Sequence, residues 1–458
     1  MSTTTLDTSA QTIDRFVSAF QVNHGQALNG TNASVAKRRE AAIQRFQELG
    51  VPTRKQEAWK YTDIASVLDR PYTLPLGPEE ADVSAADLDP YLIDDLDAHV
   101  LVLVNGRPDL SLSQLDAMPE DVTVGSLKDA GDHPAFEAHY GEYADAEDEV
   151  LTALNTAFVQ DGAFIHVPED VELEQPILLL HVNAAQDDLL MQPRHLFVVE
   201  ADAKARVIGR QLSLTGARTF TNTVTEMFVG ERGYLDHYVI QEEDDNASQV
   251  LSRFGYHEGD SVLSTDTFTF SGEVVRNNMT LTPDGPNCET NLYGLVIGHG
   301  SMHVDNNTLV DHVHADCVSN ELYKHVLNDQ STAVFNGKVF VHRDSQRIDA
   351  YQSNDSLVLN NDAQIYTKPE LEIYADDVKC SHGTTTGQLD EEAVYAMRTR
   401  GIDEATARAL LTLAFAGEVL EQVTLDAISE RVELAVAGKL PERFNLTGLV
   451  ETASALNA

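Results

Sequence analysis

Strand-like segments follow one another over residues 163–388, and no long helical pattern interrupts them. Each segment is short, alternates apolar with polar residues and is rich in Val, Ile, Tyr, Phe and Thr. Gly, Asn and Asp fill the turns, as at Asn336-Gly337. A sandwich or barrel of this many strands would be unusually large. A solenoid accommodates them, because each coil buries its face against the next. The sequence therefore predicts a mainly β fold with a β-helix core.

Helical periodicity flanks this core on both sides. Residues 34–49 carry apolar side chains at helical spacing, with Gly50 at the C-cap and Pro52 just beyond it. Between this helix and the core, Asn105-Gly106 predicts a β-hairpin. We expect three parts: an N-terminal helical and mixed domain over residues 1–150, the β-helix core over 151–388, and a C-terminal helical domain over 389–458.

The only tryptophan, Trp59, lies in a short basic and aromatic stretch, residues 54–63, of an otherwise acidic chain. The favoured interpretation is structural: Trp59 and Tyr61 pack this segment against the next domain. Contact with a partner protein is the alternative.

Three helices are predicted after residue 389. Asp390 and Asp403 have the position and side chain of N-caps for the first two. The second helix has an apolar face, which includes Leu410, Leu411 and Phe415, that is wide for a surface helix. Either the three helices pack on one another, or part of this face binds another protein.

The net charge is extreme, −43, from 74 acidic and 31 basic residues spread over 458 positions. A hydrophobic fraction of 42% is sufficient for packed cores. Because the acidic residues form no long block, the charge indicates a folded protein with an acidic surface suited to a high-salt cytoplasm. Such a surface disfavours nucleic acid, whose binding requires Lys and Arg.

The cysteines are few: Cys288, Cys317 and Cys380. An odd set without a Cys-x-x-Cys pair argues against a disulfide framework or a closed zinc site. Residues 1–23 lack the pattern of a signal peptide, and no apolar stretch is long enough to span a bilayer. We therefore expect a soluble, cytoplasmic protein in a reducing compartment, without a membrane contact.

Cys380 and His382 form the only closely spaced Cys and His pair. Two residues apart on a strand, they point to the same face. Thiolate and imidazole are ligands for iron and iron–sulfur species. The plain alternative is a small buried thiol next to a histidine that bonds the backbone.

Several histidines concentrate late in the strand region, and His312 and His314 are expected to share one strand face. A metalloenzyme would need three or four such ligands to converge. Packing or surface positions are the favoured interpretation for most of them. The chain has no Gly-x-x-x-x-Gly-Lys phosphate loop and no Gly-x-Ser-x-Gly elbow.

Several stretches resemble the SufB/SufD family, whose members belong to a complex that assembles iron–sulfur clusters. They occur in the family's order at residues 57–62, 154–158, 316–324, 333–339, 349–354, 367–373 and 376–392. The resemblance covers nearly the whole chain. It implies a right-handed parallel β-helix between helical ends, and a non-catalytic scaffold subunit.

The resemblance also implies partners and a site. The partners would be the sister subunit SufB, in a heterodimer, and the ATPase SufC, with a homodimer in isolation left open. His382, with Cys380 assisting, would hold iron or a transient iron–sulfur cluster at the subunit interface, and no other cofactor is expected. On the C-terminal helices, the implied contacts to the ATPase are Arg398, Arg400, Asp403, Leu410, Leu411 and Phe415.

Two positions depart from the SufB pattern. Ser353 stands where SufB carries an essential cysteine, and a hydroxyl cannot replace a thiolate as a sulfur carrier. Gly383 stands where SufB carries a glutamate. Both departures favour the SufD branch of the family.

Two other classes of function stay open at this point. A carbohydrate-active β-helix enzyme is one, although such enzymes are commonly secreted. A histidine-rich metalloenzyme is the other. Within the family, a SufB-like scaffold is the nearest rival, weakened by Ser353.

Overall fold

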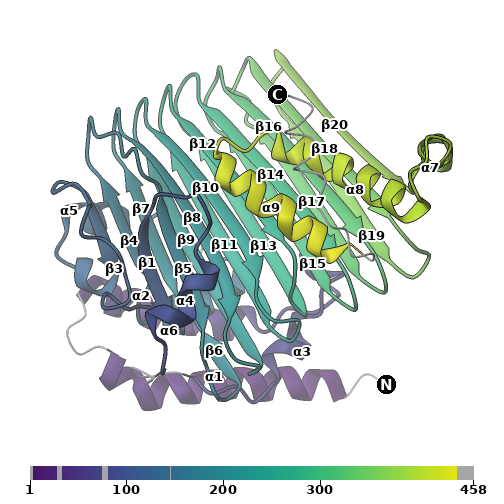
Figure 1. Ribbon diagram of the computed structural model, residues 1–458. Coiled ribbons are helices and arrows are strands. Elements are labelled where there is room, and N and C mark those ends of the chain that lie inside the picture. Colours follow the sequence, from purple (N-terminus) through teal and green to yellow (C-terminus); the bar gives the residue numbers. More distant parts are fainter. Residues whose placement is uncertain (1–3, 28–32, 75–80, 145, 441–458) are drawn as a thin grey trace.

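The molecule is a flattened parallel β-solenoid with helices at both ends of the chain (Figure 1). The computed structural model describes residues 4–27, 33–74, 81–144 and 146–440. From residue 194 onward, consecutive strands alternate between two sheets, so each coil gives one strand to each sheet. The predicted parallel β-helix with flanking helices is confirmed.

The first sheet, which we call sheet 1, is parallel except for a hairpin at one edge. Its strands, in spatial order, are β2 (Arg107–Pro108), β1 (His99–Val104), β5 (Ile177–Asn183), β8 (Lys204–Ser213), β10 (Tyr234–Glu242), β12 (Val262–Thr269), β14 (Glu289–Gly298), β16 (Val318–Leu327), β18 (Ile348–Val358) and β20 (Val378–Gly387). Asn105 and Gly106, with φ of 50° and 80°, make the predicted β1–β2 turn.

The second sheet, sheet 2, faces sheet 1 across the core. Its order is β19 (Gln364–Ile373), β17 (Thr332–Val341), β15 (His303–His312), β13 (Val274–Pro283), β11 (Ser248–His257), β9 (Thr219–Val229), β7 (Arg194–Val199), β4 (Ala163–Val167) and β3 (Thr123–Ser126), and β6 (Leu189–Met191) pairs with β9. Many strands are ten residues long, which is longer than predicted. Polar side chains also point into the solenoid, so the alternation of apolar and polar residues in the sequence stops before the strands do.

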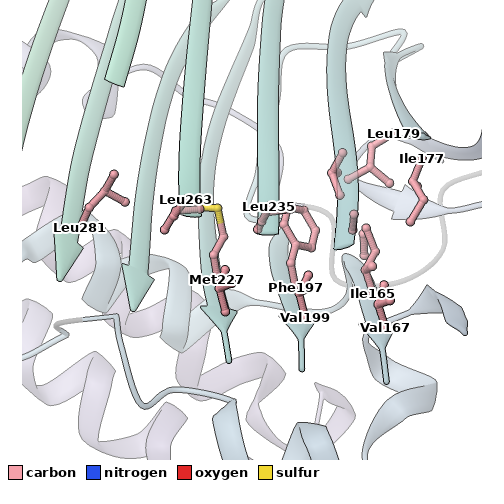
Figure 2. Packing of buried hydrophobic residues seen from close by; sticks show 14 of the residues in the cluster. Ile165, Val167, Ile177, Leu179, Phe197, Val199, Met227, Leu235, Leu263 and Leu281 are labelled. Carbon is pink, nitrogen blue, oxygen red and sulfur yellow. The ribbon is translucent and has the colours of Figure 1, made fainter. Parts of the chain in front are cut away.

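Apolar side chains fill the space between the sheets at the N-terminal end of the solenoid. Figure 2 shows Ile165, Val167, Met227, Leu235 and Leu263 among the side chains of this cluster. Each fully buried side chain of this size contributes about 1.5–3 kcal/mol. This cluster anchors the coils on which the rest of the solenoid stacks.

Most helices of the N-terminal half cover the outer face of sheet 2, whereas α4 and η2, residues 85–91, pack against sheet 1. Phe220 of β9 and Val250 of β11 pack with apolar residues of the helices on sheet 2. The helices and 3-10 turns of this half are α1 (Thr4–Ala27), α2 (Ala33–Leu49), η1 (Glu57–Trp59), α3 (Ile64–Leu68), α4 (Ala85–Leu88), η2 (Asp89–Tyr91), η3 (Lys128–Ala130), α5 (Pro134–His139) and α6 (Val150–Phe158).

Trp59 has the structural role that was predicted for it. Its buried ring lies under the guanidinium of Arg276 on β13, 3.8 Å from the ring centroid. Tyr61 stacks on Tyr366 of β19 with ring centroids 4.1 Å apart. Together they fix the N-terminal segment to sheet 2.

Helices α7 (Glu391–Arg398), α8 (Glu404–Leu420) and α9 (Asp426–Lys439) follow the last strand, and α8 and α9 lie across the outer face of sheet 1 (Figure 1). Asp390 and Asp403 cap α7 and α8, as predicted. Lys324 of β16 pairs with Glu418 of α8. In the described residues, no helix is long and apolar enough to cross a membrane.

Candidate functional site

The two sheets end together at one end of the solenoid, on β19 and β20. Within the part of the chain that the structure describes, each of these strands has one paired neighbour, β17 or β18, and an unpaired outer edge. No residue of either strand is fully buried, although β17 and β18 bury every second residue. The last coil is therefore open to solvent along its edge and its interior face.

Cys380 and His382 lie on this last strand. Their register partners on β18 are Ala350 and Gln352, both of which are buried inside the solenoid. Cys380 and His382 therefore face the same side, as predicted, and this side is the interior face at the open end. Cys380 is half-buried and His382 is exposed. Burial raises the pKa of the Cys380 thiol.

A buried polar chain lies directly behind His382. Gln352 Nε2 donates to Glu321 Oε2 at 2.7 Å, and the Thr308 hydroxyl donates to the other carboxyl oxygen. Gly337 leaves room for Gln352, because a Cβ there would lie 2.3 Å from Nε2. Burial raises the pKa of Glu321 to about 7. Gln352 Oε1 has no hydrogen bond partner among the described residues.

Sequence reasoning missed Glu321 and Gln352. They are 31 residues apart, which is one coil, and His382 occupies the same position one coil later. In-register positions of a solenoid stack on one another, but the coils differ in length, so no fixed spacing in the sequence marks this column.

The other late histidines do not form a metal site in the described chain. His312 is buried at the end of β15, whereas His314 is exposed in the following turn, so the prediction that they share a strand face is wrong. The strand ends at His312, and the turn continues to Asp316, which has φ of 65°. Burial lowers the pKa of His257 and His325 to about 3, as expected of packing residues.

Among the described residues, no group of three or more His, Cys, Asp and Glu side chains is placed to hold a metal ion. Cys380 and His382 are two donors on one open face. Ser353, which was compared with a cysteine of SufB, is a register partner of Gly383 and donates to Asp355 Oδ2 at 3.4 Å.

The polar residues that were expected to contact the ATPase lie at the α7–α8 junction. Arg398 and Arg400 are exposed, and Arg398 pairs with Glu404 at 3.1 Å. Asp403 accepts from the backbone and hydroxyl of Thr406, so its carboxylate already serves as a helix cap.

The apolar candidates Leu410, Leu411 and Phe415 are all half-buried on α8. Lys324 Nζ lies 4.3 Å from the ring centroid of Phe415, so this ring packs partly against the solenoid. The most exposed apolar side chains of the C-terminal helices are instead Tyr395, 67% exposed, and Leu434, 58% exposed.

The fold and the site together define a class of protein: a parallel β-solenoid whose open last coil carries a cysteine and a histidine on one face. Residues 181–415 match the model of the SUF system FeS cluster assembly, SufBD core domain, and residues 10–179 match the SufBD protein N-terminal region. The chain belongs to the SufBD family of iron–sulfur cluster assembly proteins.

Some of its relatives align with nearly the whole chain, and others align with a part of it. An iron–sulfur cluster assembly SufBD family protein of Synechocystis is 30% identical over 422 residues, 90% of this chain and 92% of the relative. The iron–sulfur cluster assembly protein SufD of Escherichia coli is 29% identical, over 89% of this chain and 95% of that protein. SufD of Bacillus subtilis is 24% identical over 300 residues, 64% of this chain.

Proposed function

We propose that this chain is a non-catalytic scaffold subunit of a SufBCD-type complex, and that a nascent iron–sulfur cluster is its cargo. In this proposal the open end of the solenoid pairs with SufB, and the C-terminal helices bind the ATPase SufC. One observation carries it: two ten-residue strands without a buried residue present an exposed imidazole at an unpaired edge.

The open edge favours a partner that extends the solenoid. An unpaired strand edge offers a row of N–H and C=O groups to another chain, and folded proteins usually cover such edges. Tyr351 and Tyr374, 47% and 54% exposed, lie on or beside the last coil. Tyrosine is enriched in protein interfaces.

The donor set favours a site shared between two subunits. Iron–sulfur clusters are held by several thiolate or imidazole ligands, whereas this face supplies one imidazole and one thiol. A sister chain would supply the remaining ligands. Ser353 also supports a site shared between two subunits, because a hydroxyl cannot carry sulfane sulfur and the sister chain would have to supply the thiolate.

Docking of the C-terminal helices on sheet 1 supports the ATPase contact. Thr424, between α8 and α9, bonds Asp236 at 2.9 Å and meets Tyr238 Oη at 2.9 Å. Because of these hydrogen bonds, a movement of the C-terminal helices would be transmitted to the strands of sheet 1. Exposed Tyr395 and Leu434 add apolar surface to the predicted contact residues.

The proposal is tested by co-expression with SufB and SufC and purification through a tag on this chain. Thr384→Lys places a charge on the open interior face, in register with buried Asn354. We expect it to lose SufB. Val22→Lys, at an exposed residue of α1 away from the open end, adds the same charge as a control and should retain SufB. Equal SufB recovery from both variants would contradict the pairing.

The ATPase contact has its own variants. Leu434→Asp on α9 should lose SufC and keep SufB, because a buried charge is costly at an interface. Val22→Asp, at an exposed residue of α1, should keep both partners. Retention of SufC by the Leu434 variant would refute this placement.

We also infer a high-salt cytoplasm as the working environment. Self-repulsion of a chain with net charge −43 falls as salt shortens the screening length. The unfolding temperature should therefore rise steeply with KCl concentration. A midpoint that is insensitive to KCl would refute this inference.

A further inference from the structure

Two buried thiols occupy the same position on consecutive coils. Cys288 and Cys317 directly precede β14 and β16, whose first residues are register partners, and Val318 N donates to Cys288 O at 2.9 Å. Neighbouring strands of a sheet lie about 4.7–4.9 Å apart. This spacing is within the range of Cα separations that a disulfide bridges, about 4.4–6.8 Å.

Both thiols are reduced and enclosed. Cys288 is 1% exposed and Cys317 is 0% exposed. Their Sγ atoms donate to the backbone oxygens of Glu258 and Gly285, each at 3.1 Å. The proximity of the two sulfurs lowers the pKa of Cys317 and raises that of Cys288.

His312 completes the cluster. It is fully buried, and its Nε2 meets Ser319 Oγ at 3.0 Å. Its Nδ1 has no hydrogen bond partner in the described chain. An interaction with this imidazole also lowers the pKa of Cys317. Ser319 lies two residues after Cys317, so the His312 ring lies next to the segment that carries this thiol and is available to take its proton.

We propose that Cys288 and Cys317 form a redox site, which hydrogen peroxide oxidises to an intrachain disulfide. The Cys317 thiolate attacks one peroxide oxygen, the O–O bond breaks, and hydroxide leaves and takes the proton held by His312. The resulting sulfenic acid reacts with the Cys288 thiol, so that an S–S bond forms and water leaves. Two thiols and one peroxide give one disulfide and two waters.

The site lies outside the open end that we assign to the cluster. Cys380 stands on β20, two coils beyond Cys317 along sheet 1. Because the two inner thiols are enclosed, only a reagent close to water in size suits them. The disulfide would join consecutive coils at one corner of the solenoid.

The test is oxidation of the folded full-length chain by hydrogen peroxide. After oxidation, the chain is denatured, free thiols are alkylated, and peptides are mapped by mass spectrometry. We expect a Cys288–Cys317 cross-linked peptide that a reducing agent removes. Cys380→Ser should give the same cross-link, and Cys317→Ser should give none. Full alkylation of Cys288 and Cys317 after complete oxidation of Cys380 would overturn the proposal.

The role of His312 has a separate readout. His312→Gln keeps a polar side chain of similar size and removes the base. We expect cross-linking about tenfold slower for each unit by which the thiol pKa rises. Its rate should also become steeply pH-dependent across neutral pH, unlike that of the wild type. An unchanged pH profile would assign the ring a packing role only.

Discussion

Gln352 and His382 are register partners in the parallel ladder between β18 and β20. The amide is enclosed, whereas the imidazole one coil later is exposed. The end of the solenoid thus exposes a column that is buried one coil earlier. This continuity explains why a partner that adds a further coil would enclose His382.

The first prediction concerns Glu321 and pH. The folded chain holds the Glu321 proton up to about pH 7, whereas an exposed glutamate loses it near 4.5. Between these values the folded state binds more protons than the unfolded state, so stability falls as pH rises through this window. Glu321→Gln should therefore stabilise the chain above pH 7, by up to about 3 kcal/mol, and have little effect at about pH 4 or below.

Chemical denaturation of both proteins at several pH values measures this difference. Glu421→Gln, at an exposed position, is the matched control and should track the wild type. If the Glu321 variant differs from the wild type by the same amount at every pH, the buried carboxyl does not titrate as stated.

The second prediction concerns the ion pair between Arg194 and Glu226, 1% and 0% exposed, at 2.6 Å. Glu226 also accepts from the backbone N–H groups of residues 141, 143 and 144. Glu226→Gln leaves a buried guanidinium without its counter-charge, which costs about 3–5 kcal/mol. Denaturant unfolding should show this loss, and Glu172→Gln, in an exposed pair, should cost less than about 1 kcal/mol. Equal small losses would contradict the prediction.

The third prediction uses the single tryptophan. Arg276 covers the Trp59 ring and donates to Ala58 O and Asp305 Oδ2 at 2.8 and 2.6 Å. Arg276→Met should loosen this segment from sheet 2 and shift the Trp59 emission to longer wavelength. Lys60→Met, at an exposed side chain nearby, should leave the emission unchanged. An unshifted spectrum for the Arg276 variant would show that other contacts hold Trp59.

Local signals in the sequence predicted the architecture well. Gly50 ends α2 with φ of 71°, and Asp390 and Asp403 cap their helices, because caps depend on side chains next to the helix end. The strand alternation likewise predicted the solenoid and the shared face of Cys380 and His382.

The interior partners could not be predicted in the same way, because the coils differ in length. Ser264 and Asn291, bonded on adjacent coils, are 27 residues apart, whereas Glu321 and Gln352 are 31 apart. Without a fixed period, no repeat aligns the columns. The sequence also did not show that β15 ends at His312, because the polar turn that follows has the residue pattern of a continuing strand.

The central claim is that the exposed imidazole of His382 helps to hold a nascent cluster at the junction with SufB. The most direct measurement is the iron and acid-labile sulfide content, with the visible absorption, of anaerobically purified complexes. Complexes with His382→Ala should keep both partners and lose most of the cluster, whereas His314→Ala, at an exposed turn, should match the wild type. A full complement of cluster in an intact His382→Ala complex would contradict the account.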